Sequence, residues 1–271
     1  MRNGVHILAV VVLCLIACAT TGPGGKKSFI LIPSSQEVSI GAGMANQIQN
    51  TETELADPVW QAYINEVGQK IVKVCDRRDI SYHFAVIESD QVNAFAAPGG
   101  YVYFYTGLLR KMHSEAEMAA VMAHEISHVV ARHGIKQLQK ALGVSLAYEL
   151  AFGGEGAGKA FDAAVGVGMG LIFAGYSRSA EREADNFGIN YMVKAGYHPD
   201  GALRMFETLA SLGGGGAANI FEKLSMSHPE TQERIANARR DIEEMKPLPP
   251  GLTMGAERYA EMLNRIPSKG N

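Results

Sequence analysis

Residues 113–134 read His-Ser-Glu-Ala-Glu-Met-Ala-Ala-Val-Met-Ala-His-Glu-Ile-Ser-His-Val-Val-Ala-Arg-His-Gly, and this stretch decides the fold. At its centre His124, Glu125 and His128 form the pattern H-E-x-x-H. Because each helical residue turns by about 100°, side chains four positions apart lie on one face, and the two histidines can hold one metal ion. Glu125 lies beside them, where it can activate a water molecule on that metal.

The residues before the motif favour a helix. Ser114 and Glu117 fit the capping-box pattern S-x-x-E, and Glu115 suits the positive end of the helix dipole. Gly134 is the expected stop at the far end. The alternative interpretation is an amphipathic helix with two histidines in its core.

A candidate third ligand lies downstream, in residues 177–194. Glu181 and Asp185 are four positions apart and share a helix face. Glu181 can complete a set of two His and one Glu that leaves the fourth position open, as in catalytic zinc sites. Asp185 can accept a hydrogen bond from the second nitrogen of a ligand histidine, whereas Glu183 points about 200° away from Glu181. The alternative is a charged, solvated helix face. We expect one Zn²⁺ per chain.

His133 follows the motif at nearly the spacing of a third ligand in another zinc-binding pattern. In the pattern H-E-x-x-H-x-x-G-x-x-H the last histidine lies six positions after the second. His133 lies five positions after His128, and Ala131 replaces the glycine. The spacing therefore argues against that plan, and we expect His133 to be a residue at the helix end.

Composition sets broad limits. The chain has 271 residues, of which 47% are hydrophobic and 20% charged, values ordinary for a globular protein. The net charge is −3 and no basic stretch is present, so a nucleic-acid partner is not expected.

The N-terminal sequence predicts where in the cell the protein is located. Residues 5–17 form an apolar run, too short for a comfortable membrane span, that ends at Cys18 in a pattern resembling a bacterial lipobox. We expect residues 1–17 to be a lipoprotein signal peptide, Cys18 to carry lipid, and 18–35 to be a flexible tether. Ala19 in place of Asp favours the outer membrane, so the expected location is the bacterial periplasm, with membrane contact only through the lipid. An uncleaved anchor or an ordinary secretory peptide is the alternative.

Sequence patterns predict the remaining elements. Helices are expected over 35–50, 58–74, 107–112, 137–152 and 177–194. Strands are expected over 80–88 and, around a Pro-Gly-Gly turn, within 92–105. Residues 163–176 are apolar, and we expect a helix packed on the active-site helix or a mobile lid, with a membrane-dipping segment as the alternative. Cys75 is expected to be a small core residue without a disulfide partner.

These motifs together resemble metallopeptidase family 48, which includes HtpX-like and CAAX-prenyl-protease-like zinc endopeptidases, and within it a periplasmic lipoprotein branch. The shared elements extend over residues 37 to about 240: Val92-Asn93-Ala94-Phe95, Pro98-Gly99-Gly100, the H-E-x-x-H motif, Ser177-Arg178-x-x-Glu181-x-Glu183-Ala184-Asp185 and Ser227-His228-Pro229. The resemblance implies an α+β, predominantly helical, gluzincin-type zinc metallopeptidase domain over 36–245, with a small β-sheet beside the active-site helix and Glu181 as third ligand. Residues 246–271 are expected to be a C-terminal tail.

The resemblance also implies a role for the histidine before proline. In this family a His-Pro histidine lies near the zinc, where it can stabilise the oxyanion or cap the metal in a latent form, and His228 fits that position. His198 also precedes a proline, but its surroundings indicate a loop before a helix. A loop or cap residue is the alternative for His228.

The sequence therefore predicts a zinc endopeptidase in which Glu125 transfers the proton and Asn93, Ala94, Phe95 and Ala96 bind substrate as an added β-strand. Main-chain recognition of that kind favours unfolded or misfolded envelope proteins as substrates; an ordinary structural hairpin is the alternative. Two other functions compete with this one. The first is a chaperone or assembly factor that binds outer-membrane proteins or their assembly machinery, with latent protease activity. The second is a structural zinc lipoprotein, for which a base beside the ligands would have no use.

Overall fold

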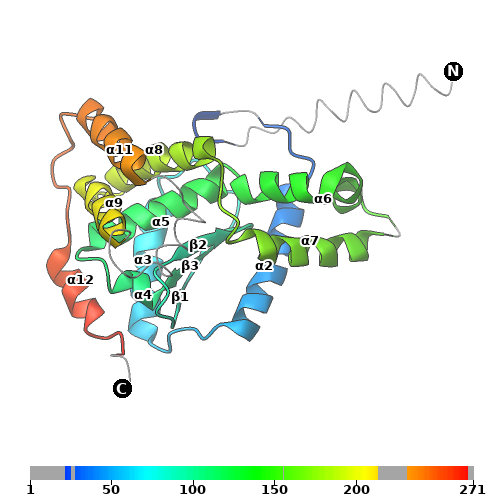
Figure 1. Ribbon diagram of the computed structural model, residues 1–271, viewed down its shortest axis with the longest axis horizontal. Helices are drawn as coiled ribbons and strands as arrows, with labels where there is room; N and C mark the ends of the chain where they lie inside the picture. The colour runs from blue at the N-terminus through cyan, green and yellow to red at the C-terminus, as the bar shows by residue number, and fades with distance from the viewer. Residues whose placement is uncertain (1–21, 26–27, 155, 213–230, 268–271) are drawn as a thin grey trace.

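The computed structural model describes residues 22–25, 28–154, 156–212 and 231–267 (Figure 1). The predicted signal peptide, the lipidation site Cys18 and the candidate oxyanion residue His228 lie outside these ranges.

The described chain is mostly helical with one small sheet, as the sequence predicted (Figure 1). The strands are β1 (His83–Ile87), β2 (Ala94–Ala97) and β3 (Tyr101–Tyr105). The helices are η1 (Pro23–Gly25), α2 (Ser34–Thr51), α3 (Pro58–Val72), α4 (Thr106–Leu109), α5 (Glu115–Val130), α6 (His133–Phe152), α7 (Ala157–Leu171), α8 (Arg178–Lys194), α9 (Asp200–Leu212), α11 (Thr231–Glu244) and α12 (Ala256–Leu263).

The sheet has the strand order β1-β3-β2. β1 runs parallel to β3, and β2 pairs antiparallel with β3, with Phe95 opposite Tyr103. The Pro-Gly-Gly turn between β2 and β3 matches the predicted hairpin, and Gly99 and Gly100 both have positive φ. β2 is therefore the strand at the sheet edge beside α5, the helix that carries H-E-x-x-H (Figure 1).

Alternation along β3 builds two cores on the two faces of the sheet. Val102 and Phe104 are buried in the main core with α3 and α5. Tyr103 and Tyr105 lie on the other face and pack with Ile48 of α2. The sheet is thus covered on both faces, and α5 is enclosed between the sheet and the helices α8 and α9.

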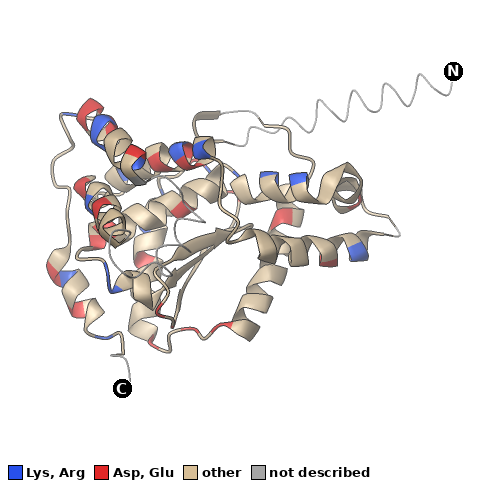
Figure 2. Ribbon diagram, viewed as in Figure 1, with Lys and Arg blue, Asp and Glu red and all other residues tan. Residues whose placement is uncertain are grey.

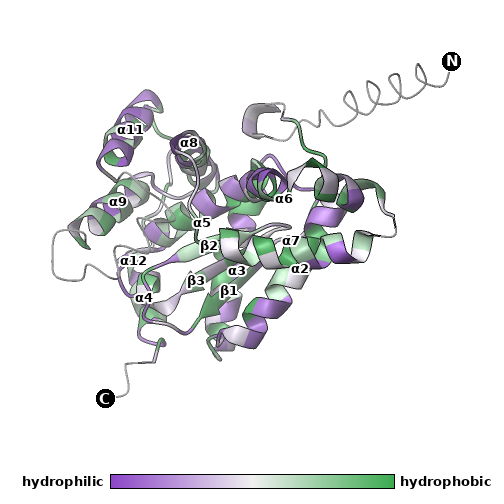
Figure 3. Cartoon of the chain, turned by 45° about the vertical axis from the view of Figure 1, so that its right-hand side comes forward, coloured by the Kyte–Doolittle hydropathy of each residue, from purple (hydrophilic) through white to green (hydrophobic). Residues whose placement is uncertain are grey.

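Helices α6 and α7 follow each other along the chain and pack together as a hairpin. The apolar helix α7 packs mainly against α6 and α2, whereas the sequence predicted a helix packed on the active-site helix or a mobile lid (Figure 3). The buried residues Ala164, Val165 and Gly168 explain this, because Val165 meets Gly43 and Gly168 meets Met44 on α2. None of the helices that the structure describes has the length and apolar character needed to cross a bilayer.

The segment after Met245 contributes to the main core. Its prolines end α11, but the chain then forms α12, on which Tyr259 is fully buried and donates a hydrogen bond from its hydroxyl to the Leu109 carbonyl at 2.7 Å. Trp60 of α3 donates its indole N–H to the Met262 carbonyl at 2.8 Å. The expected tail therefore packs closely on α3 and the start of the α5 region.

Helix α5 ends at Val130, four residues before the glycine that was expected to stop it. The chain reverses at Arg132, a non-glycine residue with φ 53°. Its guanidinium compensates for this unusual conformation, because Nε donates to Glu37 Oε2 at 2.7 Å and Nη2 donates to the Ile32 carbonyl at 2.6 Å. Arg77 donates to both Glu37 oxygens at 2.9 Å, so one buried carboxylate on α2 binds two buried arginines.

We expect Glu37→Ala to lower the free energy of unfolding by about 3–5 kcal/mol, because it leaves two buried arginines without their carboxylate. Glu66→Ala is the matched control. Glu66 also contacts two cations, Lys70 and Arg258, but its side chain is 45% exposed, so the expected loss is below about 1 kcal/mol. Urea unfolding of both variants checks the prediction, and equal losses would contradict it.

Candidate metal centre

The local structure at the start of α5 fixes the helix that carries the motif. Ser114 Oγ accepts a hydrogen bond from the Glu117 N–H at 3.3 Å, and Glu117 Oε2 accepts one from the His113 N–H at 2.9 Å. The predicted capping box is therefore formed, with the glutamate reaching the residue before the cap. Downstream, His124, Glu125 and His128 are all buried.

Helix α8 brings the third predicted ligand to this helix. α5 and α8 form the most extensive helix–helix contact of the described chain. Gly188 lies at their crossing, where an added Cβ would be 3.1 Å from the main-chain nitrogen of His124. A Cβ at that distance is tighter than most contacts in proteins, so glycine favours the close approach that places Glu181 over the two histidines.

The three predicted ligands converge on one point. His124 Nε2 and His128 Nε2 are 3.1 Å apart, and each is 3.4 Å from a different oxygen of Glu181. A tetrahedral zinc ion with bonds of about 2.0–2.1 Å separates its ligand atoms by roughly 3.3 Å. The geometry therefore fits a zinc ion, and two imidazoles with one carboxylate are a typical donor set. These residues form the single cluster of this kind in the part of the chain that the structure describes.

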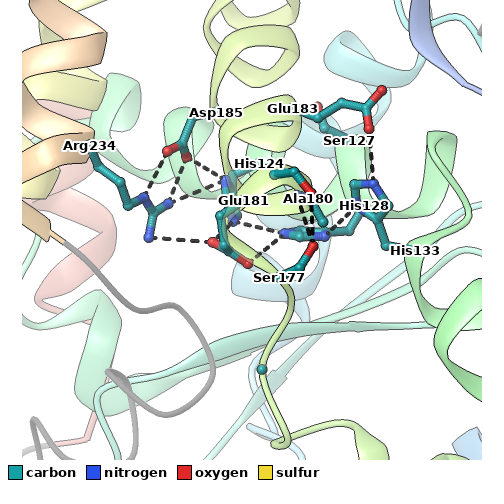
Figure 4. Close-up of polar contacts among 12 residues, drawn as sticks. His124, Ser127, His128, His133, Ser177, Ala180, Glu181, Glu183, Asp185 and Arg234 are labelled. Carbon is teal, nitrogen blue, oxygen red and sulfur yellow. Dashed lines mark hydrogen bonds and ion pairs between the residues drawn. The ribbon is translucent and has the colours of Figure 1, made fainter.

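Asp185 contacts His124, as predicted, and it also binds an arginine that sequence reasoning missed. The Asp185 carboxylate is 2.8 Å from His124 Nδ1. Arg234 of α11 donates to both Asp185 oxygens, at 2.8 and 2.7 Å, and its Nη1 lies 3.6 Å from Glu181 (Figure 4). Arg234 is buried, with its guanidinium over the Phe206 ring. Charged residues are frequent along α11, so the sequence alone does not single out this arginine (Figure 2).

The charges of this cluster shift the pKa values of its members in the metal-free chain. Burial opposes ionisation of Asp185, but the charge of Arg234 and the contact with His124 outweigh it and lower the pKa of that carboxyl to about 2. Burial alone would lower the pKa of His124, whereas its contacts with Asp185 and Glu181 raise that pKa to about 9. Both shifts favour an ionised Asp185 beside His124.

His133 was expected at the end of the active-site helix, but α5 ends at Val130 and His133 is the first residue of α6, from which it contacts the candidate metal centre. Its Nδ1 is 2.9 Å from His128 Nδ1, and its Nε2 is 3.3 Å from Glu183 Oε2. Glu183 points away from Glu181, as predicted from the helix geometry, but it reaches His133. Sequence spacing could not reveal these contacts, because they depend on the reversal at Arg132.

Tyr176 lies between the metal centre and the sheet edge. Its ring stacks on His128 with 4.2 Å between ring centroids. Burial and the negative charges of Glu125 and Glu181 raise the pKa of Tyr176. A small cavity is lined by residues that include Ala96, Pro98, His128 and Tyr176.

The predicted substrate residues lie on and beside β2. The Tyr105 N–H donates to the Asn93 carbonyl at 3.1 Å, so the alternation of an antiparallel ladder points the main-chain groups of Ala94 and Ala96 away from β3. Asn93 Oδ1 accepts from the Ala94 N–H at 2.9 Å. Phe95 stacks on Tyr103 and contacts Phe173 edge-on, at centroid distances of 5.0 and 5.4 Å. Ala96 thus has N–H and carbonyl groups on the side of His128.

A second, mainly apolar cavity opens beside Glu125. Its lining includes the polar side chains of His124 and Arg234 and the apolar side chains Val121, Met205 and Phe206. An apolar cavity with a few polar groups is the usual form of a site for a small molecule or side chain.

A buried H-E-x-x-H helix, a carboxylate from a second helix and an adjacent sheet edge together define a metallopeptidase domain. The chain belongs to peptidase family M48, whose family model matches residues 58–242.

Several named proteins are similar to this chain. It is 31% identical, over 89% of its length and 52% of the relative's, to a putative beta-barrel assembly-enhancing protease of Vibrio cholerae. It is 33% identical to the mitochondrial metalloendopeptidase OMA1 of Schizosaccharomyces pombe, covering 68% of this chain and 52% of the relative. Metalloprotease YcaL of Escherichia coli is 33% identical over 59% of this chain and 62% of the relative. The chain spans about half the length of the first two relatives.

The lowered pKa of Asp185 predicts how the stability of the metal-free protein depends on pH. A carboxyl with a pKa of about 2 when folded and a usual value near 3.8 contributes stability above pH 4, which is lost as the pH falls toward 2. Asp185→Asn removes this contribution, of about 2–3 kcal/mol at neutral pH. Urea unfolding in the presence of a chelator should therefore show a difference between wild type and variant that shrinks between pH 6 and pH 3. A difference that grows on acidification would contradict this assignment.

Proposed function

We propose that this protein is a zinc-dependent endopeptidase that hydrolyses peptide bonds in unfolded or misassembled envelope proteins. The observation that carries the proposal is the set of separations, 3.1, 3.4 and 3.4 Å, among the ligand atoms of His124, His128 and Glu181, with Glu125 on the same helix. Zinc bound there would supply a Lewis acid that activates water and polarises a carbonyl group.

Each nearby residue then has a chemical task. Glu125, buried next to His124, accepts a proton from the attacking water and passes it to the leaving amine. Asp185 accepts the Nδ1 hydrogen of His124 and so keeps the lone pair of its Nε2 directed at the site. His228 stabilises the oxyanion that forms on the substrate, a role that rests on the family resemblance alone.

Substrate binds as an extended strand beside β2. The outward carbonyl of Ala94 and the outward N–H and carbonyl of Ala96 support this proposal, because they can pair with any peptide in the extended conformation. Main-chain pairing reads little sequence, so the expected substrates are unfolded segments. Tyr176 lines the same small cavity as Ala96, so a strand bound there would lie next to its ring.

The cellular setting is part of the proposal. The lipobox-like sequence at Cys18 supports a lipid anchor in the bacterial periplasm, at the outer membrane. The name of the Vibrio cholerae relative refers to assembly of β-barrels, and similarity to it supports a role in quality control of envelope proteins. The outer-membrane assembly machinery is the corresponding candidate partner.

A chaperone or assembly factor with latent protease activity is the second candidate function. The observation that favours it is the position of Tyr176, whose ring stacks on His128 and lines the cavity beside Ala96. Such a protein would hold unfolded outer-membrane proteins without cutting them until this segment moves.

We expect Glu125→Gln to lower the rate of cleavage of an unfolded protein by about 10²–10⁴-fold, because it removes the general base. The variant should still bind one zinc ion per chain, since its ligands are intact. The measurement compares zinc-loaded full-length wild type and variant on a reduced, carboxymethylated protein substrate. Glu207→Gln, a change at an exposed residue of α9 that pairs with Arg239, is the matched control and should cleave like wild type.

Absence of cleavage by zinc-loaded wild type would contradict the endopeptidase proposal. Suppression of substrate aggregation by wild type and Glu125→Gln alike would then favour the chaperone function, because holding an unfolded chain does not need the base.

A further inference from the structure

We propose that His133 and Glu183 are positioning residues for the metal ligand His128: Glu183 fixes the tautomer of His133, and His133 fixes the tautomer and ring orientation of His128. The inference rests on the proposed function in one respect, because it takes His128 as a zinc ligand.

His128, His133 and Glu183 form a continuous chain of polar contacts, called the relay below. His128 Nδ1 is 2.9 Å from His133 Nδ1, and His133 Nε2 is 3.3 Å from Glu183 Oε2. The side chains of His128, His133 and Glu183 are 1%, 6% and 14% exposed, so water has little access to compete with these contacts. Figure 4 shows the relay on the opposite side of the centre from Asp185 and Arg234.

The positions of the hydrogens follow from simple donor and acceptor rules. An ionised carboxylate can only accept, so the His133 nitrogen facing Glu183 must carry the hydrogen. In a neutral imidazole the other nitrogen, His133 Nδ1, is then an acceptor, and His128 Nδ1–H must donate to it. The lone pair of His128 is thereby left on Nε2, the atom that faces His124 and Glu181. The relay therefore selects the tautomer that can bind a metal.

The relay complements the contact on the other histidine. His124 is held directly by Asp185, which shares a face of α8 with Glu181. Glu183 lies on another face of α8 and is separated from His128 by one side chain. His133 fills that position, because the reversal at Arg132 returns the chain beside the end of α5. Both ligand histidines are thus oriented from α8, one directly and one through His133.

Two substitutions of His133 separate hydrogen bonding from packing. His133→Phe keeps a ring of similar size but removes the acceptor for His128 Nδ1–H. His133→Asn loses volume but can place an amide oxygen near the former Nδ1. The relay predicts that Phe weakens zinc binding by about 10–100-fold, whereas Asn retains affinity close to wild type. A purely structural role predicts the reverse order, because the Phe variant preserves packing better.

The measurement is the zinc dissociation constant of the full-length chain by chelator competition, together with the visible spectrum of the Co²⁺-loaded protein. Glu183→Ala should also weaken zinc binding, but it should add nothing in the His133→Phe background, because Glu183 acts through His133. His83 lies on β1, at the opposite edge of the sheet from β2, and its ring stacks on Tyr101. His83→Phe keeps an aromatic ring there, so it is the control and should bind zinc like wild type. Circular dichroism of the metal-free variants shows whether they fold.

The outcomes separate the relay from the endopeptidase proposal. The relay is overturned if the zinc affinity of His133→Phe equals that of wild type or exceeds that of His133→Asn. If the Phe variant does not fold, an unchanged zinc affinity of Glu183→Ala overturns the relay instead. Tight zinc binding by a wild type that cuts no substrate contradicts only the endopeptidase function, and the order of dissociation constants still decides the relay. A wild type that binds no zinc overturns both.

Discussion

The close crossing of α5 and α8 is the constraint on which the candidate centre depends. Two histidines four residues apart on a helix offer two nitrogens, but a third donor has to come from elsewhere in the chain. Gly188 allows α8 to approach to the point where an added Cβ would be 3.1 Å from the His124 backbone. At that spacing a single carboxylate, Glu181, reaches both histidines at 3.4 Å, and Asp185 one turn later reaches His124 from behind. One helix crossing thereby supplies both the third ligand and the partner of the first.

Burial makes the charges of this centre interdependent. A histidine must be neutral to bind a metal. With His124 neutral, Glu125, Glu181 and Asp185 carry three formal negative charges and Arg234 one positive charge, so the net formal charge of these residues is −2. A divalent cation would neutralise that charge, which is costly in an interior of low dielectric constant. Arg234 contacts the two acidic residues of α8 differently. It binds both Asp185 oxygens at 2.7–2.8 Å but lies 3.6 Å from Glu181, which is directed at the histidines.

The sequence could predict the local features of this molecule but not the contacts that depend on tertiary packing. Helical spacing placed His124 with His128 and Glu181 with Asp185, and the capping residues Ser114 and Glu117 located the start of α5. The end of α5 was misplaced, because a glycine is the usual signal and here a buried arginine adopts the left-handed conformation instead. Arg234 could not be recognised, since its burial follows from the packing of α11 on α8 and α9. The prediction that α7 packs on α5 was wrong for the same reason, because an apolar helix indicates burial but does not indicate which surface covers it.

The reversal after α5 connects α2, the first long helix of the described chain, to the candidate ligand His128. Glu37 on α2 binds Arg132 at 2.7 Å and Arg77 at 2.9 Å, and Arg77 in turn donates to the Val129 carbonyl near the end of α5. These contacts hold the one non-glycine residue with positive φ in the part of the chain that the structure describes. The next residue is His133, whose position against His128 depends on that turn. The same Glu37 accepts a hydrogen bond from the Gly99 N–H in the turn that ends β2. A single buried carboxylate therefore positions both the far end of the active helix and the neighbouring sheet edge, the two surfaces between which an extended substrate would lie.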